Sequence, residues 1–157
     1  MDILFELFLP KNIDLESFDL KEIFAEWAGE KYSQDPKKYQ WNDFVIFEEY
    51  KDTASYSNLI GHEVTLGNYN SYTLKGDLIN QLQELIYKNK PIKNNELYFF
   101  FKEFLSKINN WVVLTLIDYD QFDKTYKVND IDEAFFLLEK SCHPEHPEGI
   151  ALIKNNI

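Results

Sequence analysis

Along the chain, hydrophobic residues recur in some segments with the spacing of a β-strand and in others with the spacing of an α-helix. These segments define the predicted elements. The segment DILFELFLP, residues 2–10, places Ile3, Phe5, Leu7 and Leu9 on one side of an extended chain. Further apolar residues fall on its other side, a pattern typical of a strand that is buried on both faces. We therefore expect the first element to be an inner strand of a sheet.

The following segment, FDLKEIFAEWAGEK, spans residues 18–31 and has a helical period. Its apolar residues recur at i, i+3, i+4 and i+7, and they are Leu20, Ile23, Phe24 and Trp27. Asp19 and Glu22 have the spacing of a capping box, with Asp in place of the usual Ser or Thr. The pattern predicts a first helix, then a loop, and then a second strand at residues 43–50.

The middle of the chain combines a predicted hairpin with two helices. The segments 62–66 and 71–75 flank the turn-forming stretch GNYN, which indicates a β-hairpin. Leucines at helical spacing predict a helix within residues 76–90. Residues 95–109 contain a run of Phe that is compatible with a strand, but their apolar spacing favours a helix.

The last third of the chain contains the most apolar strand. Residues 111–120 are apolar on both faces, so we expect a central strand, with residues 122–128 pairing back as its hairpin partner. Asp130 and Glu133 have cap spacing at the start of a predicted helix over residues 130–141, and residues 149–154 predict a closing strand.

This order of elements, β-α-β-β-β-α-α-β-β-α-β, determines the expected fold class. A chain of 157 residues is most simply one domain, so we expect residues 1–157 to form a single globular unit. Hairpins combined with helical crossovers predict an α+β fold, in which a mixed, largely antiparallel sheet packs with about four helices.

The composition places the chain among globular proteins. Hydrophobic residues make up 45% of it and aromatic residues 17%. The single cysteine cannot form an internal disulfide, which fits a reducing compartment. The start of the chain lacks the features of a signal peptide, and no run approaches the roughly 20 apolar residues of a membrane helix. The expectation is a cytoplasmic protein that does not bind membranes.

The charge balance narrows the classes of partner. Aspartate and glutamate number 27 against 16 basic residues, all of them lysine, and the net charge is −11. Without the arginine fork that grips phosphates and base edges, an acidic chain is a poor candidate for nucleic acid or anionic membranes. The acidity either serves solubility or attracts a basic partner.

The stretch SCHPEHPEG contains Cys142, His143 and His146, which are candidate zinc ligands or a Cys–His nucleophile. Two adjacent residues are difficult to aim at one ion, and no second ligand pair completes a tetrahedron. The remaining histidine, His62, is distant in sequence. We therefore expect an exposed connection, with no metal, no cofactor and no catalytic residue. A small metal-binding protein or enzyme that uses this loop remains the alternative.

Three groups of acidic residues, two of them interleaved with tyrosine, are the candidate partner-binding residues. They are Glu22, Glu26 and Glu30 on the predicted first helix, Glu48, Glu49 and Asp52 beside Tyr50, and Asp118, Tyr119, Asp120 and Asp123. Like charges four residues apart on a helix cost roughly 0.2–0.5 kcal/mol per pair, so the first group is not explained by stability. Acids mixed with tyrosines suit a surface that holds a cationic partner.

In size, acidity, scarcity of cysteine and these acidic–aromatic patches, the chain resembles the immunity proteins that neutralise bacterial toxins, including those of contact-dependent inhibition. The resemblance is one of class, and no functional residue is carried over from it. It implies a protein that binds and occludes a cognate toxin, often a basic nuclease. Independently of the resemblance, the size of the core and the incomplete set of metal ligands predict a monomer or weak dimer that folds without metal. A generic interaction module is a further alternative.

Overall fold

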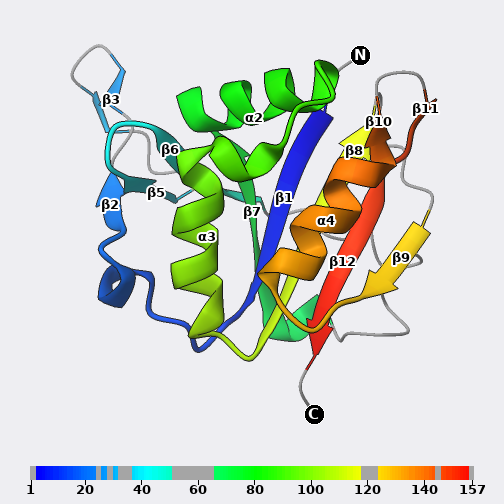
Figure 1. Cartoon of the computed structure of the whole chain (residues 1–157). Coiled ribbons are helices and arrows are strands. Elements are labelled where there is room, and N and C mark those ends of the chain that lie inside the picture. Colours follow the sequence, from blue (N-terminus) through cyan, green and yellow to red (C-terminus); the bar gives the residue numbers. More distant parts are fainter. Residues whose placement is uncertain are drawn as a thin grey trace.

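One large sheet and three α-helices on one of its faces make up the described part of the protein (Figure 1). The structure, a computed structural model, describes residues 3–23, 26–27, 30–31, 37–50, 66–117, 124–143 and 146–155. The α+β class expected from the sequence is confirmed.

The sheet has eight strands, and all of its neighbouring pairs are antiparallel except the last. Its spatial order is β2 (Lys21–Ile23), β5 (Lys38–Trp41), β6 (Val45–Tyr50), β7 (Tyr69–Lys75), β1 (Ile3–Pro10), β8 (Asn110–Ile117), β12 (Ile150–Asn155) and β9 (Lys124–Lys127). Only β12 and β9 are parallel. A mixed, largely antiparallel sheet was the prediction, and it is confirmed.

Two short ribbons and three 3₁₀ helices complete the strands and turns of the described residues. The ribbons pair β3 (Glu26–Trp27) with β4 (Glu30–Lys31), and β10 (Cys142–His143) with β11 (His146–Pro147). The 3₁₀ helices are η1 (Leu15–Phe18), η3 (Leu66–Asn68) and η4 (Ile92–Asn94).

Three α-helices are present in the described residues, and they are α2 (Asp77–Tyr87), α3 (Glu96–Ser106) and α4 (Ile131–Ser141). Capping side chains satisfy the first backbone N–H groups of two of them, α3 and α4. Asn95 accepts the Leu97 N–H at 2.8 Å, and Asp130 accepts the Glu133 N–H at 2.8 Å, as its spacing predicts. Within the described residues, none of the helices combines the length and the apolar character needed to span a bilayer.

The inner strands β1 and β8 are buried on both faces of the sheet, as predicted. On the helical face, Phe5 and Leu7 belong to the large core that includes all three helices. On the opposite face, Phe8, Val112 and Leu114 belong to a second, smaller apolar cluster. The core of the protein is therefore divided by the sheet into two parts, of which the larger lies beneath the helices.

The predicted helix over residues 18–31 is wrong. Phe18 ends η1, Asp19 adopts a left-handed conformation with φ 62°, and β2 then pairs with β5. Leu20 is buried, and the Phe18 ring meets Phe104 of α3 edge to face. Leu20 and Phe18 are therefore packed against the rest of the protein, although the chain at this point is extended and not helical. The described residues hold three α-helices rather than about four, and the acids of this segment do not form a helical stripe.

Two predicted hairpins are also wrong, because each needs a strand edge that another strand occupies. The stretch GNYN is not a hairpin turn, because Gly67 and Asn68 belong to η3, and Tyr69 and Asn70 belong to β7, which lies between β6 and β1. Residues 62–65 themselves lie outside the described residues. Strand β8 lies between β1 and β12, so β9 pairs in parallel with β12 instead, and α4 forms the crossover between them.

Candidate functional site: an acidic–aromatic groove

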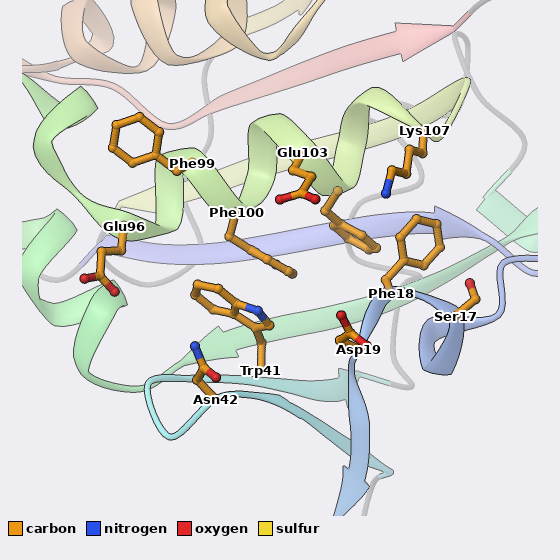
Figure 2. Close-up of a pocket in the computed structure, with 11 residues that line it drawn as sticks. Ser17, Phe18, Asp19, Trp41, Asn42, Glu96, Phe99, Phe100, Glu103 and Lys107 are labelled. Carbon is orange, nitrogen blue, oxygen red and sulfur yellow. The ribbon is translucent and has the colours of Figure 1, made fainter.

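A groove runs between α3 and the opposite wall formed by η1, β2 and the turn after β5 (Figure 2). A hollow of about 380 Å³ lies against α3, and a larger hollow of about 610 Å³ shares Asp19, Trp41 and Asn42 with it. The aromatic lining consists of Phe18, Trp41, Phe99, Phe100 and Phe104. The charged lining of the hollow against α3 consists of Asp19, Glu96, Glu103 and Lys107. We call this the acidic–aromatic groove.

A ladder of aromatic rings forms the floor of the groove. Trp41 stacks on Phe100 with ring centroids 4.4 Å apart, and Phe100 stacks on Phe104 at 5.2 Å. Phe18 closes the ladder by meeting Phe104 edge to face at 4.7 Å. Such ring pairs contribute about 0.5–1.5 kcal/mol each beyond the area that they bury, so the two walls are held at a defined separation.

Helix α3 displays its polar groove residues at helical spacing. Glu96, Glu103 and Lys107 follow one another at intervals of seven and four residues, so they share one side of the helix (Figure 2). The other side of α3 is fixed to α4, because the Tyr98 hydroxyl donates a hydrogen bond to Asp132. Phe99 remains 61% exposed at the groove, although it is a large apolar side chain.

A second group of acids converges on Tyr39 beside the groove. Burial, together with the negative charges of Glu22, Glu49, Glu16 and Asp14, raises the pKa of the Tyr39 hydroxyl above its usual value. We call these four acids with Tyr39 the tyrosine patch. It is continuous with the groove in the fold, because η1 and β5 contribute to both.

Tyr72 lies behind Tyr39, with ring centroids 6.1 Å apart. Burial, then the neighbouring Tyr39 and the charge of Glu49, raise the pKa of Tyr72 to about 12, although a hydrogen bond with Asn70 opposes the shift. Because both tyrosines remain neutral over a wide range of pH, the patch combines neutral hydroxyls with ionised carboxylates.

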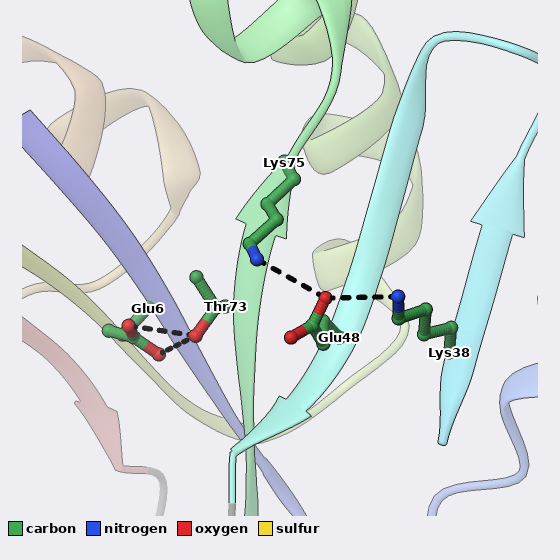
Figure 3. Close-up of polar contacts among 5 residues, drawn as sticks. All are labelled: Glu6, Lys38, Glu48, Thr73 and Lys75. Carbon is green, nitrogen blue, oxygen red and sulfur yellow. Dashed lines mark hydrogen bonds and ion pairs between the residues drawn. The ribbon is translucent and has the colours of Figure 1, made fainter. Parts of the chain in front are cut away.

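The structure separates the acids that the sequence placed together on residues 48–52. Glu49 faces the tyrosine patch with Glu22, whereas Glu48 lies on the opposite face of the sheet (Figure 3). Its carboxylate lies 3.5 Å from Lys38 Nζ and 3.3 Å from Lys75 Nζ. On the same face, the buried Glu6 carboxylate accepts the Thr73 hydroxyl at 2.9 and 3.0 Å. Glu48 therefore has a structural role.

The structure does not describe the side chains of the remaining predicted site residues. The backbones of Glu26 and Glu30 belong to the β3–β4 ribbon. The others lie outside the described residues, and they are Asp52, Asp118, Tyr119, Asp120 and Asp123.

The acids of the groove and of the tyrosine patch are not ion-paired within the described residues. The ion pairs found there use other acids, namely Glu48, Glu84, Asp132 and Glu148. The side of the protein that contains the groove therefore presents carboxylates that form no ion pair within the described residues, although Lys107 also lines the groove.

The histidine-rich loop forms the β10–β11 ribbon, in which His143 pairs in register with His146 and Cys142 with Pro147. His62 lies outside the described residues. Among the residues that the structure describes, no group of three His, Cys, Asp or Glu side chains is placed to hold a metal ion.

Half of the groove could have been found in the sequence. Glu96, Phe99, Glu103 and Lys107 occur at helical spacing on a helix that was predicted correctly. The opposite wall could not, because it depends on two elements that were not predicted, namely β5 and η1, which ends at Phe18.

Comparison with protein-family models, with curated proteins and with solved structures found no match. The function is therefore inferred from the residues of the groove and the tyrosine patch.

Proposed function

We propose that the protein binds and neutralises a basic protein partner, and that this partner is a cognate toxin, as the resemblance to immunity proteins implies. The observation that carries the proposal is the side of the protein where the groove and the tyrosine patch adjoin, because its acids are not ion-paired within the described residues. Such an inhibitor would act in the cytoplasm without a cofactor.

Charge and aromatic surface serve different steps of such binding. The net charge of −11 attracts a basic partner over a distance of about a Debye length, roughly 8–10 Å at physiological salt, and raises the association rate. Exposed aromatic side chains such as Phe99 then provide apolar area that is buried in the complex. Carboxylates that form no ion pair within the described residues are favourable for the complex, because pairing with the partner does not first require breaking such a pair.

Variants of equal charge test the proposal. We compare a patch variant, Glu22→Gln/Glu49→Gln, and a groove variant, Glu96→Gln/Glu103→Gln, with a control on α2, Asp77→Asn/Glu84→Gln. Each removes two negative charges from exposed or partly exposed positions. Proteins captured from the native host by the wild type are expressed singly in a test strain, and a toxic partner is then co-expressed with each variant.

The expected result is that the wild type and the control protect the cells, whereas at least one of the patch and groove variants does not. Neutralising acids at the rim should mainly slow association and flatten its dependence on salt. The proposal is wrong if no captured protein is basic and toxic, or if the patch and groove variants both protect as well as the control. Loss of protection only on replacing Cys142, His143 and His146 would favour the metal or enzyme alternative.

A further inference from the structure

We propose that the acidic–aromatic groove receives a basic amphipathic helix of the partner, in which two cationic side chains two turns apart pair with Glu96 and Glu103. The apolar side chains between them cover Phe99. This inference rests on the proposed function, since it names the part of the basic partner that enters the site.

The spacing of the two carboxylates is the first reason. Glu96 and Glu103 are seven residues apart on α3, which corresponds to about 10.5 Å along the helix axis. A partner helix places residues i and i+7 at the same separation of about 10.5 Å on one face. An extended strand places residues of one face about 6.7 or 13 Å apart, so it matches the carboxylates poorly.

The position of the apolar surface is the second reason. Phe99 lies near the midpoint between the two acids, and it is 61% exposed. In a helix, residues i+3 and i+4 lie on the same face as i and i+7, so they can cover this ring. A polyproline segment brings every third residue to one face at about 9.3 Å, but its intervening residues point away and leave Phe99 uncovered.

The charge of the groove is the third reason. Glu96 and Glu103 form no ion pair within the described residues, although Lys107 lies one turn beyond Glu103. Asp19 adds a carboxylate from the opposite wall (Figure 2). An arginine or lysine between the walls can therefore pair with carboxylates while its side chain lies against the ring of Trp41.

Two synthetic peptides of identical composition test the inference. Both are alanine-rich helices with two arginines and two leucines. The matched peptide has arginines at i and i+7 and leucines at i+3 and i+4, whereas the control peptide has its arginines at i and i+5, on different faces. Binding is measured by calorimetry and by the NMR signal of the Trp41 indole N–H, assigned with Trp41→Phe. The buried Trp111 serves as the internal reference.

We expect the matched peptide to bind at least about tenfold more tightly than the control peptide and to shift the Trp41 signal, a difference that corresponds to about 1.4 kcal/mol. The preference should disappear in Glu96→Gln/Glu103→Gln and persist in Asp77→Asn/Glu84→Gln. The charge-reversed variant Glu96→Lys/Glu103→Lys should instead bind a matched peptide with glutamates in place of its arginines.

Equal affinity for the two peptides, an unshifted Trp41 signal, or tighter binding of a proline-rich peptide with arginines three residues apart would overturn the inference. Its failure can be told apart from failure of the proposed function. If the natural toxic partner loses affinity for the patch variant but not for the groove variant, the protein still neutralises a basic partner, and only the helix-binding groove is wrong.

Discussion

Replacing Glu48 by Gln removes a charge from the face of the sheet opposite the helices, where the carboxylate pairs with both Lys38 and Lys75. The Glu48 side chain is 22% exposed, but that of Lys75 is 55% exposed, so solvent screens part of the attraction. Partly exposed pairs contribute about 0.2–1 kcal/mol each, so we expect a total loss of about 0.5–1.5 kcal/mol. For a domain of this size the loss corresponds to a melting temperature lower by about 1–6 °C.

Replacing the adjacent Glu49 by Gln removes the same charge from the other face of the same strand. Glu49 has no ion pair within the described residues and adds to the negative field around Tyr39. We therefore expect the free energy of unfolding to change by less than about 0.5 kcal/mol. Association with a basic partner should become slower, whereas Glu48→Gln should leave association unchanged.

Urea denaturation at low and high salt separates the two effects. The deficit of Glu48→Gln should shrink as salt is added, because salt screens the exposed parts of its ion pairs. The reasoning is refuted if Glu49→Gln destabilises the protein as much as Glu48→Gln, or if Glu48→Gln is as stable as the wild type at low salt. Either result would mean that the two faces of β6 do not differ in the way the contacts indicate.

Three further outcomes are expected. The pKa of Tyr72 is raised to about 12 in the folded protein, so its contribution to stability is complete below about pH 10 and is lost as pH rises through about 12. Urea midpoints measured across that window should fall less steeply for Tyr72→Phe than for the wild type, and parallel curves would contradict the shift. Leu114→Ala should cost about 2–5 kcal/mol, because the side chain is fully buried in the apolar cluster of the non-helical face, and an unchanged midpoint would remove it from the core. Finally, Cys142→Ser/His143→Asn/His146→Asn should keep binding and protection, and a chelator should not lower the wild-type melting temperature by more than about 5 °C, a shift that corresponds to roughly 1–2 kcal/mol.

The elements that the sequence predicted correctly are those whose local pattern agrees with their burial. Helices α2, α3 and α4 have apolar residues at helical spacing, and α3 and α4 also have side-chain caps, from Asn95 and Asp130. Strands β1 and β8 are apolar on both faces, and both lie inside the sheet. In these segments, local preference and tertiary packing favour the same structure.

The errors occur where the fold is decided by distant partners. Leu20 has helical spacing with its neighbours, but it is buried beside a strand that pairs with β5. Strand β5 has only four residues, too few for alternation to identify it. Which strand occupies the second edge of β8 depends on β12, about 40 residues later, and no local pattern contains that information. The groove could not be predicted as a whole for the same reason.

The insertion of β12 between β8 and β9 determines the order in which the chain can complete its sheet. During synthesis, β1 and β7 are available to pair before β8 is made, but the second edge of β8 has no partner until residues 150–155 have emerged. Strand β9 likewise cannot pair until these residues have emerged, because its neighbour in the sheet is β12. A nascent chain that stalls before this point therefore exposes two strands without their final neighbours, and unpaired strand edges promote aggregation.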